Sequence, residues 1–277
     1  MTPVQKTYRV NGYDLSVLEA GETSAIPLLL VHGSLCDQRI WTAQLAALAG
    51  RYRVLALSLR HFWPEQWDGS GDGYEIRHHA GDIAALIDHL GAGPVHLLGH
   101  SRGGHVCFRV AQHHPDLIRA LILAEPGGQL DPALADHGTP PPGADLGQMF
   151  GDSANLIARG ETDAGLELFV TAVGGPKAWK YASEDFKAMA RDNAMTIVGQ
   201  AREARLTFMK AEIEKIDMPV LLIGGALTRG HFPKVMDAME RLMPDAERVT
   251  IEGAGHPMYE QRPAAFNDAV LGFLALR

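Results

Sequence analysis

The chain has 277 residues, of which 46% are apolar and 21% are charged, and its formal net charge is −8. This composition is typical of a soluble globular protein with a sizeable core, and the length suits one large domain or a domain with an insert. Because the chain is acidic and carries no basic block, nucleic acid is not expected as a partner.

The start of the chain and its two cysteines bear on the cellular compartment. The first residues lack the apolar run of a secretory signal peptide, and no apolar stretch approaches the roughly 20 residues that a membrane span needs. Cys36 and Cys107 stand far apart and show no metal-ligand spacing. We therefore expect a reduced, cytoplasmic protein without a membrane anchor. The sequence leaves open whether it is a monomer or a homodimer.

Strand and helix patterns alternate along most of the chain. Two short strands in residues 5–19 flank Asn11-Gly12, a strong hairpin turn. Buried strands are expected at residues 27–31, 54–57, 94–98, 121–123, 219–223 and 248–251. Apolar residues at helical spacing follow most of these strands. The alternation predicts an α/β fold with a doubly wound, mostly parallel, eight-stranded sheet that begins with an antiparallel hairpin.

Residues 126–217 differ from the rest of the chain. They read as helical segments rich in Ala, Glu and Met, with no strand signal. The sequence therefore predicts a core domain formed by residues 1–125 and 218–277. The segment 126–217 is expected to form a helical cap inserted after the sixth strand.

The motif G-x-S-x-G occupies residues 99–103, between an apolar run and an apparent helix. In this context the serine sits on a sharp strand-to-helix turn, and small neighbours are needed because side chains there would collide. The turn exposes the hydroxyl of Ser101 at a helix N-terminus, where free N–H groups favour negative charge. Ser101 is thus the candidate nucleophile.

A second candidate, His256, stands in a Gly-Ala-Gly-His-Pro loop after the last predicted strand. In this topology that loop returns to the sheet edge that carries Ser101. A histidine there can accept the proton of a nucleophilic serine. We therefore expect His256 to be the general base.

At this point the chain resembles capped α/β-hydrolase fold proteins, a group that includes haloperoxidase-like esterases and ring-cleavage hydrolases. The resemblance rests on His32-Gly33-Ser34, on the motif around Ser101 and on Gly255-His256, and the alternation of elements extends it over nearly the whole chain. It implies that Ser34 and Arg102 donate backbone N–H groups to an oxyanion. It also implies an enzyme that needs no cofactor and no metal.

The triad acid departs from the commonest pattern of that family. The acid usually follows the strand at 219–223, but Leu227 stands near that position and no carboxylate occurs between Asp217 and Asp237. Glu125, at the end of an earlier core strand, is the alternative. Haloalkane dehalogenases and zearalenone-type lactone hydrolases resemble this chain in placing a glutamate there. We therefore assign the orienting acid to Glu125, with a structural carboxylate as the alternative reading.

Three residues are candidates for substrate binding. The side chain of Arg102 could attract a carboxylate or phosphate of the substrate, or pair with a carboxylate of the cap. Trp41 and Trp63 could line the pocket or serve in packing. The sequence leaves open which cap residues line it among Met149, Phe150, Phe169, Trp179 and Met195.

Together these residues predict a serine hydrolase that cleaves a carboxylic ester or lactone of a small molecule through an acyl-enzyme. Hydrolysis of a carbon–carbon bond, a hydroxynitrile-lyase-like reaction and a non-catalytic receptor for a small ligand remain open alternatives. The family's epoxide hydrolases and haloalkane dehalogenases are disfavoured, because both need a carboxylate where Ser101 stands.

Overall fold

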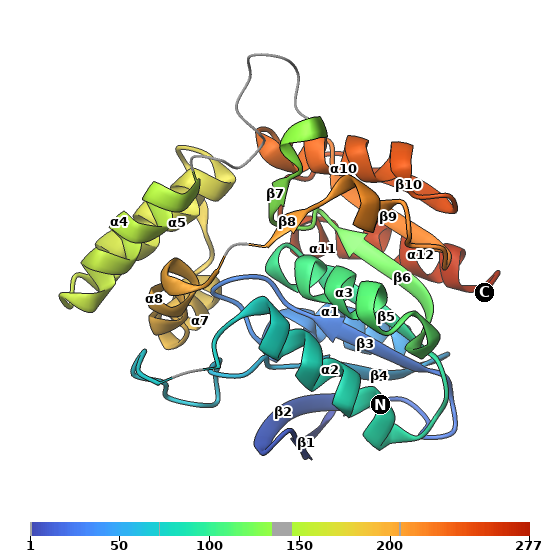
Figure 1. The fold of residues 1–277 in the computed structure, drawn as a ribbon. Helices are drawn as coiled ribbons and strands as arrows, with labels where there is room; N and C mark the ends of the chain where they lie inside the picture. The colour runs from blue at the N-terminus through green and yellow to red at the C-terminus, as the bar shows by residue number, and fades with distance from the viewer. Residues whose placement is uncertain (1, 72, 135–145, 205) are drawn as a thin grey trace.

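The computed structural model describes residues 2–71, 73–134, 146–204 and 206–277. Its centre is an eight-stranded sheet in the order β1-β2-β4-β3-β5-β6-β9-β10 (Figure 1). The strands are β1 (Val4–Val10), β2 (Tyr13–Ala20), β3 (Pro27–Val31), β4 (Arg53–Leu57), β5 (Val95–His100), β6 (Ile118–Ala124), β9 (Val220–Gly225) and β10 (Ala246–Ile251). β1 and β2 form an antiparallel hairpin, β2 is antiparallel to β4, and the remaining pairs are parallel. The predicted fold class is confirmed.

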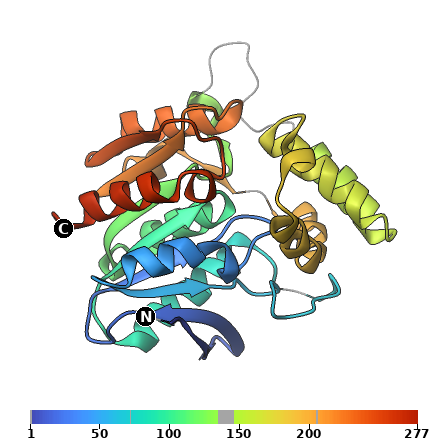
Figure 2. The same ribbon diagram turned by 180° about the vertical axis from the view of Figure 1, so that it is seen from behind.

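Consecutive strand residues point to opposite sides of this sheet, so its apolar side chains emerge on both faces. Helices cover both faces. They are α1 (Thr42–Leu48), α2 (Ile76–Leu90), α3 (Arg102–His113), α10 (His231–Leu242), α11 (Met258–Gln261) and α12 (Pro263–Leu274). Leu29 packs in one apolar cluster with residues of α2, α3 and α10. Its neighbour Leu28 packs in another cluster with residues of α1 and α12, the two helices in front in Figure 2.

The described chain between β6 and β9 is mainly helical. It contains α4 (Leu146–Ala158), α5 (Thr162–Gly174), α6 (Ala178–Tyr181), α7 (Glu184–Asp192), α8 (Met195–Arg202) and α9 (Lys210–Ile213). Helices α4 to α8 lie to one side of the sheet in both views (Figures 1 and 2). Several of these helices share an apolar cluster of their own, which also takes in Leu35 from the loop after β3. The boundaries of a separate cap domain stay a prediction.

One detail of this segment differs from the sequence-based expectation of no strands. Gln129–Leu130 (β7) and Thr207–Phe208 (β8) pair as two short parallel strands. A strand of two residues is too short to produce an alternating pattern, so only the folded chain reveals it.

The parallel strands end at the same edge of the sheet, and the loops that follow them gather there. Val31, His100 and Ala124 are the last residues of β3, β5 and β6. The residues that come next are therefore neighbours in space although they are distant in the sequence. Among the residues that the structure describes, no helix combines the length and hydropathy needed to cross a bilayer.

Candidate active site

Ser101 sits on a strained turn between β5 and α3. Its φ of 52° lies in the left-handed region that residues with a side chain rarely adopt. The turn is held by Ser101 N–H, which donates to the carbonyl of Ala124 at 3.0 Å, and by Gly127 N–H, which donates to the carbonyl of Ser101 at 2.9 Å. The backbone strain is thus supported by β6 and by the loop that follows it.

Glycine is needed on both sides of this turn, because the surrounding atoms leave no room for a side chain at positions 99 and 103. A Cβ atom at position 103 would lie 2.3 Å from the carbonyl oxygen of Val31, and one at position 99 would lie 2.3 Å from that of Gly103. α3 begins at Arg102, directly after the serine. The unpaired N–H groups of its first turn therefore lie next to the hydroxyl, where they favour a developing anion.

The structure brings His256 and Glu125 into direct contact. Nδ1 of His256 lies 2.6 Å from Oε2 of Glu125, a distance typical of a charge-assisted hydrogen bond. Because a carboxylate only accepts hydrogen bonds, Nδ1 carries the proton in this pair and Nε2 is left as the basic nitrogen. The arrangement orients the imidazole as a base for a serine hydroxyl.

Glu125 is itself fixed by the ends of two strands. It follows β6 directly, has a φ of 44°, and its backbone N–H donates to the carbonyl of Ile223 at 3.0 Å. Its other carboxylate oxygen accepts from Gly225 N–H at 2.8 Å, and the residue is only 1% exposed. Both carboxylate oxygens are therefore engaged, one by the backbone of β9 and one by His256.

The position after β9 where the family acid usually stands carries no carboxylate. Leu227 is 59% exposed, and its N–H donates to the carbonyl of Ala254 at 2.8 Å. A Cβ atom at Gly224 would lie 3.5 Å from Oε1 of Glu125. The glutamate from β6 therefore reaches the end of β9.

Two aromatic rings hold the imidazole of His256. The ring of Phe232, from α10, is stacked on it with centroids 4.0 Å apart and an interplanar angle of 19°. The ring of His100 lies 4.4 Å away, and its Nε2 is 3.0 Å from the backbone oxygen of His256. Burial lowers the pKa of His100 well below its usual range, so this ring is neutral and donates to that oxygen.

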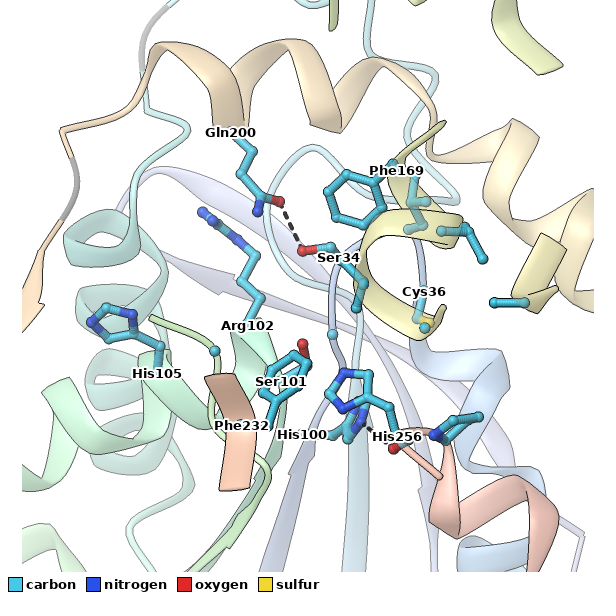
Figure 3. Close-up of a pocket in the computed structure, with 18 of the residues that line it drawn as sticks. Ser34, Cys36, His100, Ser101, Arg102, His105, Phe169, Gln200, Phe232 and His256 are labelled. Carbon is cyan, nitrogen blue, oxygen red and sulfur yellow. Dashed lines mark hydrogen bonds between the residues drawn. The ribbon is translucent and has the colours of Figure 1, made fainter. Parts of the chain in front are cut away.

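The two predicted oxyanion donors both border the cavity that contains Ser101. A Cβ atom at Gly33 would lie 3.1 Å from Cβ of Ser101, so the loop that carries Ser34 passes close to the nucleophile. The hydroxyl of Ser34 donates to Oε1 of Gln200 at 2.8 Å (Figure 3). Donation by the backbone N–H groups of Ser34 and Arg102 to an oxyanion stays a prediction.

The side chain of Arg102 borders the cavity but is already paired. Its NH2 nitrogen donates to Glu203 at 2.8 Å, and NH1 donates to the other oxygen of the same carboxylate. The guanidinium also lies over the ring of Tyr74, 4.6 Å from its centroid. Burial disfavours the charge, but Glu203 and Tyr74 outweigh it and raise the pKa of Arg102 above its usual value. Of the two roles expected for this side chain, the geometry matches the pair with a carboxylate from the helical segment.

Neither Trp41 nor Trp63 borders the cavity, so the geometry matches the packing alternative for both residues, and a contact with substrate stays a prediction. Trp41 is fully buried and packs against Tyr259 and Phe266, at centroid distances of 4.9 and 6.4 Å. Trp63 lies under the guanidinium of Arg39 at 4.0 Å. Both tryptophans therefore serve packing, one between α1 and α12 and one beneath a surface arginine.

The cavity above Ser101 has a volume of about 690 Å³ (Figure 3), within the range of small-molecule sites. Phe150 and Phe169, two of the five residues that the sequence left open, border it, and their rings stack at 5.2 Å. Met149, Trp179 and Met195 do not border it. Gln200, Glu203 and Phe232 also border it and carried no sequence motif. No group of three or more His, Cys, Asp or Glu among the described residues is arranged to hold a metal ion.

Comparison with known proteins agrees with this fold. A family model described as the alpha/beta hydrolase fold matches residues 26–263. A soluble epoxide hydrolase from Corynebacterium sp. is 26% identical, over 96% of this chain and 95% of that protein. A solved hydrolase from Pseudomonas aeruginosa superposes with a TM-score of 0.79 at 25% identity, covering 98% of each chain. An esterase from Rhodococcus sp. shares the fold, with a TM-score of 0.77 at 22% identity and 99% of each chain covered. The chain belongs to the alpha/beta hydrolase fold family.

Proposed function

We propose that this protein is a serine hydrolase that cleaves a carboxylic ester or lactone of a small molecule. The observation that carries the proposal is the contact of 2.6 Å between His256 and Glu125 at the sheet edge where Ser101 sits on its strained turn. A nucleophile, a base and an orienting acid are the three groups that acyl transfer by serine requires.

The reaction follows from the roles of these side chains. The oxygen of Ser101 attacks the ester carbonyl while Nε2 of His256 takes its proton, and the negative charge moves to the carbonyl oxygen near the first turn of α3. The tetrahedral intermediate collapses, the bond to the alcohol oxygen breaks, and His256 returns the proton to that oxygen. Water then attacks the acyl-enzyme by the same route and releases the acid. Glu125 stabilises the imidazolium during both steps.

The similarity to epoxide hydrolases makes epoxide opening the second candidate. In the family resemblance described above, those enzymes use a carboxylate as nucleophile, whereas this chain has Ser101 at that position. We therefore favour acyl transfer. Carbon–carbon bond hydrolysis uses the same three residues and differs only in the leaving group.

The test is labelling with a fluorophosphonate, read by intact mass, on the wild-type protein and on Ser101→Ala. We expect one adduct on the wild type and none on the variant, together with turnover of p-nitrophenyl esters. An unlabelled wild type that opens an epoxide would overturn the proposal. Labelling without turnover of any ester, lactone or diketone would favour a lyase or a receptor instead.

A further inference from the structure

An ion pair forms part of the wall of the cavity. Arg102 directly follows the nucleophile, and Glu203 directly follows α8 in the helical segment. Their side chains are 3% and 9% exposed. Two N–H groups of the guanidinium meet the two oxygens of the carboxylate, the bidentate geometry that arginine forms best.

This pairing determines the electrostatic character of the site. The Arg, Lys, Asp and Glu side chains that border the cavity, among the described residues, are Arg102, Lys177, Glu203 and Glu260. Lys177 and Glu260 are exposed, whereas Arg102 is buried and Glu203, which pairs with it, is nearly so. The charge of Arg102 is thus cancelled by Glu203 inside the cavity.

The part of the wall formed by the loop after β3 and by α4, α5 and α7 is mainly apolar. In Figure 3 Arg102 and Gln200 lie to one side of Ser101 and Phe169 lies to the other. The larger aliphatic and phenylalanine side chains that border the cavity there are Leu35, Phe150, Phe169, Val170, Val173 and Phe186. A carboxylate placed against these side chains would lose its hydration without gaining a partner among them, which is costly. An alkyl chain or an uncharged ring meets no such penalty there. Lys177, between α5 and α6, also borders the cavity but is exposed.

We propose that Glu203 is a specificity-determining residue that, by neutralising Arg102, makes the site select uncharged esters with an apolar acyl chain over esters that carry a carboxylate. This inference rests on the proposed function, since it names the substrate class of the same site. Arg102 without its partner would be a buried cation next to the nucleophile, which is a binding site for an anion. Glu203 thus removes an anion site that the sequence around Ser101 would otherwise create.

The experiment compares two substrates that differ only in a terminal carboxylate: p-nitrophenyl hexanoate and the mono-p-nitrophenyl ester of adipic acid. For the wild type we expect kcat/KM for the hexanoate to exceed that for the adipate by about 100-fold, the effect of leaving a charged group without a partner. In Glu203→Gln the ratio falls at least about tenfold, because the freed guanidinium pairs with the substrate carboxylate. An unchanged ratio, or a wild type that prefers the adipate, overturns the inference.

Two further variants and one control make the result specific. Arg102→Met leaves Glu203 unpaired, so the preference for the hexanoate over the adipate should increase. If Glu203→Gln does not fold, this variant still tests whether the Arg102–Glu203 pair sets the preference. The double variant Arg102→Met/Glu203→Gln should return to the wild-type ratio. Asp192→Asn breaks a different ion pair, with Arg39 at 2.8 Å, and Asp192 does not border the cavity. Its ratio should equal that of the wild type. An equal fall in Asp192→Asn would assign the effect to the packing of the helical segment and overturn the role of Glu203.

A binding measurement separates failure of this inference from failure of the proposed function. Ser101→Ala and Ser101→Ala/Glu203→Gln are titrated in a calorimeter with methyl hexanoate and with monomethyl adipate. We expect the first protein to bind the hexanoate more tightly, and the second to gain affinity for the adipate. A wild type that takes no fluorophosphonate label disproves the proposed mechanism, whereas equal affinities in both proteins disprove the role of Glu203.

Discussion

The ring of Phe232 lies almost flat on the imidazole of His256, with centroids 4.0 Å apart. Phe232 is the second residue of α10, the helix that follows β9, and is 2% exposed. The connection after β9 is where the family usually carries its acid. In this chain the carboxylate that contacts His256 comes from Glu125, directly after β6, and the helix after β9 contributes an aromatic face that packs on the imidazole.

Replacement of Phe232 by leucine should therefore slow catalysis without unfolding the protein. Leucine keeps the site apolar but cannot stack, and an aromatic pair contributes about 0.5–1.5 kcal/mol beyond burial. We expect kcat on a p-nitrophenyl ester to fall by about three- to tenfold with little change in KM. Phe232→Tyr retains the ring and should keep most of the activity. Equal losses in both variants, at equal melting temperatures, would show that stacking is not the cause.

Glu125→Gln tests the assignment of the triad acid. The amide can donate to Nδ1 of His256 and so favours the tautomer in which Nε2 carries the proton and cannot act as base. We expect kcat to fall by about a thousandfold or more, with a small change in melting temperature. Glu19→Gln is the matched control: Glu19 is a buried carboxylate, 4% exposed, that pairs with Arg53 away from the cavity. Near wild-type turnover in Glu125→Gln would mean that another carboxylate has this role.

Short-range patterns explain why much of this architecture could be predicted. The residues around Ser101 are constrained within a single turn, so five consecutive positions contain the whole signal. Glu125 was singled out by the lack of a carboxylate between Asp217 and Asp237, and the structure places it 2.6 Å from His256. The α/β class and the mostly parallel sheet follow from the alternation of strands and helices along the chain.

The walls of the cavity depend on contacts that no local pattern encodes. Arg102 and Glu203 are 101 residues apart, and their pairing exists only once the end of α8 packs near the turn at Ser101. For Trp41 and Trp63 the sequence leaves open whether they line the pocket or serve in packing, because the direction in which an aromatic side chain points is set by tertiary packing. The place of Phe232 at the cavity is likewise set by tertiary packing, so the sequence did not indicate it.

Gly103→Ala should prevent the turn at Ser101, between β5 and α3, from forming. The added Cβ atom would lie 2.3 Å from the carbonyl oxygen of Val31, and a backbone group in a buried strand cannot move aside at low cost. We expect the free energy of unfolding in urea to fall by at least about 3 kcal/mol, or the variant to fail to fold. Gly272→Ala is the control, since it lies in α12 and its Cβ would have no neighbour within 4 Å. It should be neutral or stabilising by up to about 1 kcal/mol. Equal stability of the two variants would contradict the argument.

His96 in β5 should make the protein sensitive to acid. It is fully buried, and neither ring nitrogen has a hydrogen-bond partner within the described ranges. Burial lowers its pKa to about 4, so it binds a proton far more readily in the unfolded chain, where its pKa is about 6.5.

Its contribution to stability is therefore complete above pH 6.5 and is lost as the pH falls toward 4. At pH 5 the loss relative to pH 7 is about 2 kcal/mol. His96→Leu should reduce the fall in unfolding free energy between pH 7 and pH 5, measured by urea denaturation, by about this amount. His113→Gln, an exposed position, should leave that fall unchanged. If His96→Leu loses as much stability as the wild type over this range, protonation of His96 does not drive acid unfolding.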